Sequence, residues 1–280
     1  MQFDVIEKND HAVFQYGKEN DRLYLMKWDG KDPELLLAKM NTIITQNGYS
    51  KAFIKVREEY ASFFAENEFI EEARIPGYYG ACDCVFMGKF YDSKRSFLSI
   101  KEREAMVKTL STALEKQKRQ KKDESELPGG FSLRPLVSSD IPELCSLYKD
   151  VFKTYPFPIH DEEYIADTMQ NSVEYFGVFY EGKLAGASSA EIDAETSSAE
   201  LTDFAVNPEF RGNKLSSVLL DSMETALKER GIKTPYTIAR AMSAGMNCTF
   251  AKAGYSYAGT LVNNTNISGS IESMNVWYKK

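Results

Sequence analysis

The stretch VNPEFRGNKLSS, residues 206–217, constrains the fold of this chain more than any other part of the sequence. It follows AELTDFAV, which is typical of a strand, and precedes apolar residues at helical spacing that end at Gly231. The pattern predicts a strand, a turn at proline and a helix that begins just after Arg211 and Gly212. A helix start presents unpaired N–H groups and the positive end of the helix dipole, which favour phosphate groups. We therefore expect an α/β protein with a phosphate-binding loop.

Composition and charge narrow the function. The chain has 280 residues, enough for two domains, and its net charge of −7 argues against nucleic acid or an anionic membrane as the main partner. The start, MQFDVIEKND, lacks the features of a signal peptide, and no apolar run approaches the ~20 residues of a membrane helix. We expect a cytoplasmic protein. Four cysteines without a CxxC pair and only two histidines predict no metal site.

A charged segment, EKQKRQKKDESELPGG at residues 115–130, marks the clearest boundary. It has no apolar periodicity and ends in Pro-Gly-Gly, which predicts a helix end followed by a linker. We expect an N-terminal α/β domain at residues 1–122, a linker at 123–130 and a second domain at 131–280. In the second domain the patterns predict the order β-α-α-β-β-β-α-β-α-β-β.

Three segments of the second domain occur within this order: SLRPLVSSDIPEL, FAVNPEFRGNKLSSVLLDSMETAL and NCTFAKAGY. Together they resemble the GNAT superfamily of acetyl-CoA-dependent N-acetyltransferases, over residues 131–280. The resemblance implies an α/β (α+β) fold with a central mixed, mostly antiparallel sheet. It also implies acetyl-CoA as the co-substrate, without a metal.

The N-terminal part predicts the order β-α-β-α-β-β from RLYLMKW to CDCVFMGKFY, which equals the order of the chain from AELTDFAV onward. FAENEF, residues 64–69, even stands where FAKAGY, residues 250–255, stands. We interpret the N-terminal domain as a degenerate half-copy of the GNAT fold, with convergent packing as the alternative. Unlike strand orders would contradict the half-copy. The turn WDGKDPELL lacks the Arg-Gly pair, so no CoA site is expected there.

The phosphate loop of the family has the pattern Arg/Gln-x-x-Gly-x-Gly/Ala. The corresponding residues here are, in order, Arg211, Gly212, Asn213, Lys214, Leu215 and Ser216. Lys214 thus replaces a glycine and Ser216 a smaller residue. Because backbone amides bind the phosphates, a lysine serves if its φ is helical and its side chain pairs with the phosphates or points away. A positive φ at Lys214, or a side chain that fills the phosphate site, would contradict this interpretation of the loop.

The strand before the loop carries the expected catalytic groups. The resemblance implies that backbone groups at Phe204, Ala205 and Val206 bind the pantetheine and that an N–H there polarises the thioester carbonyl. Glu200 is the first candidate for the base that deprotonates the amine, and Asp203 is the second. In a regular strand Asp203 points to the opposite face, but a bulge would change that. A solvent-facing carboxylate is the alternative for each.

The last helix is expected to complete the cofactor site. Where the family often has a tyrosine that protonates the leaving thiolate, this chain has Phe250, so Tyr255, Tyr257 or water is expected to supply the proton. Asn247 is suited to hydrogen-bond the pantetheine or the substrate, with a helix cap as the alternative.

The tail GYSYAGTLVNNTNISGSIESMNVWYK, with ARIPGYYG, VFMGKFYD and YPFPIHD, resembles the β-lysine N-acetyltransferase family over nearly the whole chain. This resemblance alone implies the acceptor: acetyl-CoA and β-lysine give Nε-acetyl-β-lysine, a compatible solute. A small diamino acid needs partners for its carboxylate, its second amine and its methylene chain. The candidates are Arg240 for the carboxylate, Asn263, Asn264 and Glu272 for the β-amine, and Tyr155, Phe157 and Tyr164 as aromatic walls. The N-terminal domain is expected to close the pocket or to pair subunits in a homodimer.

Two other functions stay open at this point. The acceptor could be another diamine, an amino acid such as lysine, or a protein amine. The departures from the family pattern at Lys214, Ser216 and Phe250 also fit a non-catalytic acyl-CoA-binding protein.

Overall fold

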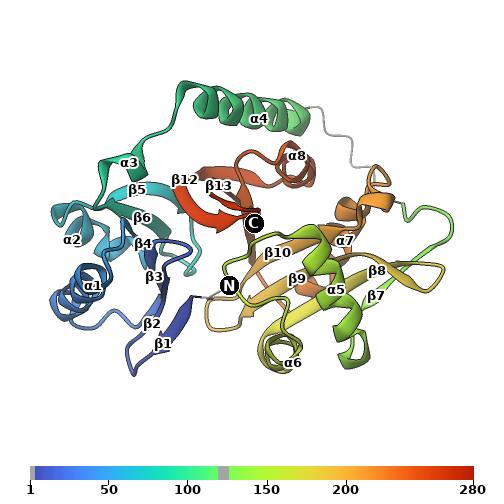
Figure 1. The fold of residues 1–280 in the computed structure, drawn as a ribbon, viewed down its shortest axis with the longest axis horizontal. Helices are drawn as coiled ribbons and strands as arrows, with labels where there is room; N and C mark the ends of the chain where they lie inside the picture. Colours follow the sequence, from blue (N-terminus) through green and yellow to red (C-terminus); the bar gives the residue numbers. More distant parts are fainter. Residues whose placement is uncertain (1–3, 119–125) are drawn as a thin grey trace.

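The strands of the chain join in one continuous sheet (Figure 1). The computed structural model describes residues 4–118 and 126–280. Among these residues the sheet has 13 strands, in the order β1-β2-β3-β4-β6-β5-β12-β13-β11-β10-β9-β8-β7. We call residues 4–90 the N-terminal half and residues 131–280 the C-terminal half.

The elements of the N-terminal half are β1 (Val5–Lys8), β2 (Ala12–Gly17), β3 (Arg22–Trp28), α1 (Pro33–Asn47), β4 (Lys51–Arg57), α2 (Ala61–Glu66), β5 (Ile70–Ile75) and β6 (Cys84–Phe90). Two helices follow, α3 (Ser93–Ser96) and α4 (Ile100–Lys118). The C-terminal half contains β7 (Phe131–Pro135), α5 (Ile141–Val151), α6 (Glu162–Asn171), β8 (Val173–Tyr180), β9 (Lys183–Asp193), β10 (Ser198–Val206), α7 (Leu215–Glu229), β11 (Thr234–Arg240), α8 (Ala244–Lys252), β12 (Ser256–Ile267) and β13 (Ser270–Tyr278).

The mixed, mostly antiparallel architecture expected from the sequence is confirmed. Among the described strands, the parallel neighbours are β3–β4 and β10–β11. Every element predicted for residues 131–280 is present in the predicted order. The prediction omits β1, β2 and α3, which have 4, 6 and 4 residues.

The helix after the loop buries the apolar stripe predicted from its spacing. Leu215, Leu219, Met223 and Leu227 are each at most 2% exposed and lie in one core with residues of β8, β9 and β10. Burying each such side chain contributes ~1.5–3 kcal/mol. This packing holds the first turn of α7 beside the end of β10 and so positions the loop between them.

The predicted domain boundary, between residues 122 and 123, lies outside the described residues. Helix α4, which that boundary assigns to the N-terminal domain, packs against α8 and lies over it in Figure 1. Ala113 belongs to the core of the C-terminal half, and Gln117 Nε2 donates to the Tyr255 carbonyl at 2.7 Å. Helix α4 therefore covers the C-terminal half.

The two halves have the same arrangement of strands. Strands β1–β6 follow the spatial order 1-2-3-4-6-5 and β8–β13 the order 8-9-10-11-13-12, with the parallel pair at the same place in each. The last hairpin of each half has a register shift at the corresponding place, between Glu71 and Ala73 and between Tyr257 and Gly259. Convergent packing does not require matching irregularities. These observations support our proposal that the N-terminal half is a degenerate copy of the C-terminal one.

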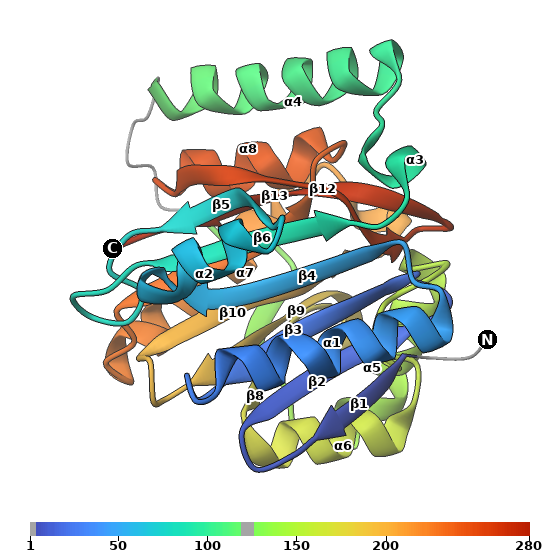
Figure 2. The ribbon, with the colours of Figure 1, turned by 90° about the vertical axis from the view of Figure 1, so that its left-hand side faces the viewer.

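The halves join where β5 meets β12 (Figure 2). Ala73 pairs with Gly259, which holds the same place in the other hairpin, so the junction has approximate twofold symmetry. Gly259 has φ +150°, and a Cβ there would lie 2.2 Å from the Glu72 carbonyl oxygen. A buried Lys51–Glu72 ion pair also holds β12, because Lys51 Nζ donates to the Val262 carbonyl and Glu72 accepts from the Val262 N–H, both at 2.7 Å.

Candidate active site

Strands β10 and β11 separate in the middle of the C-terminal half. They pair from Ser198–Thr234 to Glu200–Tyr236 and no further, although β10 continues to Val206 and β11 to Arg240. Beyond Glu200, β10 pairs only with β9 and β11 pairs only with β13. Backbone groups along the facing edges are therefore free for a ligand.

A pocket of about 560 Å³ lies at the end of β10, and we call it the cofactor pocket. The end of β10, the loop with the first turn of α7, the start of α8 and part of α4 line it. Its charged lining residues are all cations, in a chain of net charge −7: Lys116, Arg211, Lys214 and Lys252. A cationic pocket at a helix start suits a ligand that carries phosphates.

The backbone at Lys214 contradicts the expected helical conformation. Its φ is +59°, so by the criterion stated above the interpretation of how Lys214 fits the loop is wrong. The reason is the path of the chain, because Lys214 turns the loop into α7, which begins at Leu215. Asp32, with φ +48°, does the same before α1 in the N-terminal half. Lysine therefore adopts a conformation suited to glycine, at a cost of ~1–2 kcal/mol.

Most other residues predicted for the loop and strand line the pocket. Ala205 does not, because it is fully buried in the core on the other face of the sheet. Asn213 fixes the turn instead, since its Nδ2 donates to the Phe210 carbonyl at 2.9 Å. The predicted residues that line the cofactor pocket are Phe204, Val206, Arg211, Gly212, Lys214, Leu215 and Ser216.

Asn247 and Phe250 lie in the core beside the cofactor pocket rather than in its lining. Asn247 Nδ2 donates to two backbone carbonyls, and its Oδ1 accepts from Asn275 and Trp277. The side chain has nothing left for pantetheine, which contradicts the predicted binding role. Asn247 is not a helix cap either, because Ser243 holds the cap position of α8 and no side chain makes a capping hydrogen bond there. Phe250 packs edge-on against Phe204, with ring centroids 5.5 Å apart, so it supports the wall of the pocket from behind.

A second cavity, of about 160 Å³, lies on the other face of β10, and we call it the acceptor cavity. Glu200 and Thr202 line it, whereas Ala199 and Leu201 alternate with them and face the core under α7. Both halves of the chain build this cavity. The C-terminal half also supplies Glu191, Tyr155 and Tyr236, and the N-terminal half supplies Arg22, Tyr24, Phe53 and Lys55.

Glu200 and Glu191 are register partners on β10 and β9, and both line the acceptor cavity. Burial raises the pKa of both carboxyls, and the charge of Glu200 adds to the effect on Glu191, whose pKa is raised to about 8. The Lys55 ammonium and a hydrogen bond from the Tyr236 hydroxyl partly offset this rise in the pKa of Glu200. Near neutral pH the pair therefore holds one proton between its two carboxyls. The other carboxyl is ionised and can accept a second proton.

Asp203 lies in a bulge, with φ +55° and a register shift between Thr202 and Ala205. Its carboxylate accepts hydrogen bonds from the hydroxyls of Tyr155 and Ser189. The bulge foreseen as an exception to regular alternation is thus present. Asp203 does not line the acceptor cavity, whereas Tyr155 does, so its carboxylate orients a wall residue.

Of the predicted aromatic walls, Tyr155 and Phe157 line the acceptor cavity. Tyr164 does not, because it lies on α6 and packs against the core beneath α5 and α6. Its predicted contact with the substrate is therefore contradicted. Tyr24 and Tyr236, which the prediction omits, are the further rings in the lining.

Arg240 and Glu272 bind each other, which contradicts their predicted separate roles. Nε and Nη2 of Arg240 donate to the two Glu272 carboxylate oxygens at 2.9 and 2.6 Å. Neither residue lines the acceptor cavity. A bidentate pair satisfies both charges, so neither is left for a substrate carboxylate or amine.

The asparagine-rich tail mainly fastens the two halves together. Asn263 Nδ2 donates to the carbonyls of Arg95 and Phe97 at 2.8 and 3.0 Å, which contradicts its predicted contact with an amine. Asn266 Nδ2 donates to the Glu19 carbonyl at 2.8 Å. Asn264 alone of the predicted asparagines lines the acceptor cavity.

Tyr255 is fully buried in the core of the C-terminal half and lines neither cavity. This contradicts its predicted role as the proton donor to the thiolate. Tyr257 is no better placed, because its hydroxyl bonds Thr260 Oγ1 at 2.5 Å and it too is outside the lining. No tyrosine of the described residues lines the cofactor pocket, so water is the remaining alternative.

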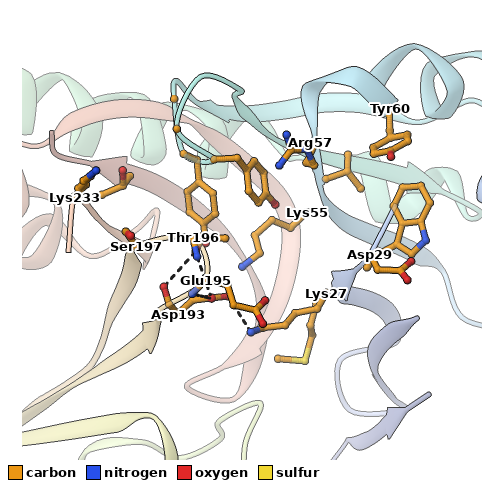
Figure 3. A pocket seen from close by; sticks show the side chains of 18 residues that line it. Lys27, Asp29, Lys55, Arg57, Tyr60, Asp193, Glu195, Thr196, Ser197 and Lys233 are labelled. Atoms are coloured by element: carbon orange, nitrogen blue, oxygen red, sulfur yellow. Dashed lines mark hydrogen bonds and ion pairs between the residues drawn. The ribbon is translucent and has the colours of Figure 1, made fainter. Parts of the chain in front are cut away.

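A third pocket, of about 500 Å³, adjoins the acceptor cavity, because Met26, Lys27 and Lys55 line both. We call it the outer pocket. Figure 3 shows the Lys55 side chain in the middle of this pocket and Lys27 paired with Asp193, with Nζ and Oδ2 2.9 Å apart. The outer pocket lies between the two halves and carries side chains of both signs.

The prediction missed Glu191 and all the lining residues from the N-terminal half. Glu191 had a readable signal: the turn after Asp193 pairs it with Ser198, which places Glu191 opposite Glu200. Arg22, Tyr24 and Lys55 had none, because their place in the cavity depends on how the two halves join.

In residues 4–118 and 126–280 there is no group of three or more His, Cys, Asp and Glu side chains placed to hold a metal ion. No helix in the same ranges is long and apolar enough to cross a membrane.

Comparison with known proteins agrees with this geometry. Residues 141–252 match the acetyltransferase (GNAT) family. The chain is also 41% identical to the β-lysine N(6)-acetyltransferase of Methanococcus maripaludis, over 98% of both chains. The chain therefore belongs to the GNAT acetyltransferase family.

Two more relatives share most of the chain. One is the β-lysine N(6)-acetyltransferase of Methanosarcina mazei, 35% identical over 75% of this chain and 83% of the relative. The other is the N-acetyltransferase YodP of Bacillus subtilis, 32% identical over 96% of each chain.

Proposed function

We propose that this chain transfers the acetyl group of acetyl-CoA to the ε-amine of β-lysine, giving Nε-acetyl-β-lysine. The observation that carries the proposal is that two cavities flank β10 just beyond the point where it stops pairing with β11. Thr202 of β10 lines the acceptor cavity, and Phe204 lines the cofactor pocket. The names of two relatives, which cover most of this chain, supply the acceptor.

The residues of the cofactor pocket fit acetyl-CoA, which supplies the acetyl group when bound. The cations Lys116, Arg211 and Lys214 suit its phosphates. Two amides at the start of α7, those of Leu215 and Ser216, have no helical partner because they belong to its first turn. The free edge of β10 near Phe204 offers an N–H where negative charge develops on the thioester oxygen.

The acceptor amine must lose a proton before it can attack. An alkylammonium has a pKa of about 10.4, so deprotonation at pH 7 costs ~4–5 kcal/mol. In the proposed mechanism the Glu200 carboxylate takes this proton, and Glu191 beside it keeps the local charge low by holding its own. Lys55 stabilises the ionised form of Glu200. Tyr155, held by Asp203, orients the methylene chain.

A cavity of about 160 Å³ fits a small metabolite better than a polypeptide. A charged acceptor would enter through the outer pocket, where Lys27, Asp193 and Lys55 line the way. The cytoplasmic location, the homodimer and the role of the product as a compatible solute stay predictions from the sequence.

The test is release of CoA thiol from acetyl-CoA over a panel of β-lysine, lysine and 1,5-diaminopentane. We expect β-lysine to be the best acceptor, with the ε-acetyl product identified by NMR. Glu200→Gln should lower kcat by ~10²–10⁴ with CoA binding unchanged. The matched control is Glu181→Gln, an exposed residue at a hairpin turn, with no change expected. CoA binding without turnover of any amine would refute the proposed acetyltransferase activity. Full activity of Glu200→Gln would show that Glu200 is not the base.

A further inference from the structure

Two residues that line the acceptor cavity each keep a buried polar atom without a partner. Arg22 is 4% exposed, and its Nε has no hydrogen-bond partner among the described residues. Asn264 is 1% exposed, and its Oδ1 likewise has none there. A buried polar group without a partner destabilises the fold, so such a group commonly marks a place for a ligand.

Arg22 also has no directly bonded counter-ion among the described residues. Its Nη1 donates to the Asn264 carbonyl at 2.6 Å and to Thr265 Oγ1 at 3.0 Å, and Nη2 to Gln15 Oε1 at 3.4 Å, which are all neutral acceptors. No ion pair joins Arg22 to a carboxylate in the described ranges. Asp4 and Glu200 act on it only from longer range, and burial lowers the pKa of Arg22 to about 10. A buried guanidinium in this state favours an anionic ligand with two oxygens.

Arg95 shows what a purely structural arginine looks like here. It is 6% exposed and binds the same tail, because its Nε donates to the Asn263 carbonyl at 2.7 Å. In contrast to Arg22, it has a carboxylate partner, Asp21, and each of its three nitrogens donates a hydrogen bond. Arg95 does not line the acceptor cavity. Fastening the tail therefore does not explain the free donor of Arg22.

The free donor and the free acceptor belong to neighbouring residues across the junction of the halves, since Arg22 bonds the backbone of Asn264. A donor beside an acceptor matches a carboxylate beside an ammonium, which is the head group of an amino acid. Arg22 and Glu200 shift each other's pKa, so the two ends of the cavity lie within electrostatic reach.

We propose that Arg22 and Asn264 bind the head group of the acceptor amino acid, its carboxylate on Arg22 and its non-reacting ammonium on Asn264 Oδ1. This inference rests on the proposed function. The distal amine then lies at Glu200. The cavity thus selects a diamino acid over a plain diamine, and the N-terminal half supplies the carboxylate clamp that Arg240 cannot.

The experiment compares β-lysine with two analogues that each lack one part of the head group. Pentane-1,4-diamine lacks the carboxylate, and 6-aminohexanoate lacks the β-amine. For the wild type we expect kcat/KM to fall about 100-fold for each analogue, since each leaves a buried partner unsatisfied. Arg22→Gln should lower kcat/KM for β-lysine and reduce the carboxylate preference to about 1–3-fold. Asn264→Leu should reduce the β-amine preference to about 1–3-fold and leave the carboxylate preference unchanged.

Two further variants separate recognition from folding. Arg95→Gln removes a buried arginine from the same tail and should lower the melting temperature without changing either preference. Arg22→Lys keeps a cation and should retain part of the carboxylate preference. CoA binding by each variant verifies that the cofactor pocket is intact.

The outcomes distinguish the inference from the proposed function. If the wild type acetylates β-lysine but the carboxylate preference survives Arg22→Gln, the head-group site is refuted and the function stands. If another amino acid is the better acceptor, the function is refuted, and that amino acid with its decarboxylated amine tests Arg22 in the same way. Equal kcat/KM for the wild type with and without the carboxylate refutes the head-group site, while acetylation of β-lysine itself still stands.

Discussion

Lys214 meets two opposite demands, one on its backbone and one on its side chain. Its φ of +59° suits glycine, whereas its ammonium suits the phosphates of the cofactor. We expect Lys214→Gly to raise the free energy of unfolding by ~0.5–1 kcal/mol, because the strain relieved exceeds the entropy that glycine adds to the unfolded chain. The same change should weaken acetyl-CoA binding several-fold. Chemical denaturation and calorimetric titration with CoA measure the two effects.

Lys214→Ala is the matched control, since it removes the charge and keeps the strained conformation. It should weaken CoA binding as much as Lys214→Gly does, with no gain in stability. Equal stability of the two variants would show that the left-handed backbone costs nothing here.

The carboxyl pair of the acceptor cavity sets the acid limb of the pH–rate profile. Because Glu191, with its pKa raised to about 8, still holds its proton where Glu200 titrates, Glu191→Gln should leave the acid limb of kcat/KM in place. Lys55→Met should move it up, since the Lys55 ammonium lowers the pKa of Glu200. A shift of the acid limb in Glu191→Gln would refute this assignment.

The same carboxyl has a consequence for stability. The pKa of Glu191 is raised from 4.5 to about 8, so between these values the folded chain holds a proton that the unfolded chain releases. The free energy of unfolding therefore falls as pH rises through this window. Glu191→Gln should remove ~1–2 kcal/mol of that fall between pH 5 and pH 8. Urea denaturation at the two pH values measures it.

Residue-level prediction from the sequence found residues of the cavity linings where backbone position decides the place of a side chain, and failed where the partners of a side chain decide it. Arg211, Gly212 and Glu200 follow from strand, turn and helix order, and they line the cavities. Arg240 and Asn247 were assigned by side-chain chemistry alone. Each proved to be bound to another part of the chain, which a sequence does not reveal.

At the scale of elements, Gly259 decides how closely β5 and β12 approach. We expect Gly259→Ala to lower the free energy of unfolding by ~1–3 kcal/mol, because a Cβ 2.2 Å from the Glu72 carbonyl must push the strands apart. It should also raise KM for the acceptor, since Asn264 lies farther along β12. Denaturation and steady-state kinetics measure the two effects.

Gly129→Ala is the control, because nothing lies within 4 Å of a Cβ placed there and its φ is not positive. It should change stability by at most ~0.5 kcal/mol. A Gly259→Ala protein as stable and active as the wild type would mean that the junction can widen freely.

Elements were predictable where periodicity runs long enough. The stripe of α7 and the strands of the C-terminal half are of this kind. The matching order of both halves was also visible, because each helix and strand of the N-terminal half has its own pattern. The pairing of β5 with β12 was not visible, since it rests on a single register pair between residues far apart in the chain.

For the whole molecule, the shared sheet and the buried Lys51–Glu72 pair should make both halves unfold together. Each half has one of the two tryptophans, Trp28 and Trp277, so the Trp28→Phe and Trp277→Phe proteins report on one half each. In each protein we expect the same denaturant midpoint by fluorescence and by far-UV circular dichroism. Midpoints that differ between the two probes would show that the halves are independent units.

Glu72→Gln should lower stability by ~3–5 kcal/mol, because it leaves the Lys51 charge buried and uncompensated. The double change Lys51→Met with Glu72→Leu is the control and should recover most of that loss. If Glu72→Gln is no less stable than the double variant, the pair does not hold the halves together.

The bond from Arg22 to Asn264 spans 242 residues, and this distance has a consequence during synthesis. While the ribosome makes the chain, β5 emerges long before β12, so its edge stays uncovered until the last strands appear. An uncovered edge is a template for other strands, and the charges of Glu71 and Arg74 on β5 disfavour such pairing. The acceptor cavity, which residues of β12 and β13 help to line, is therefore complete only when the final strands are in place.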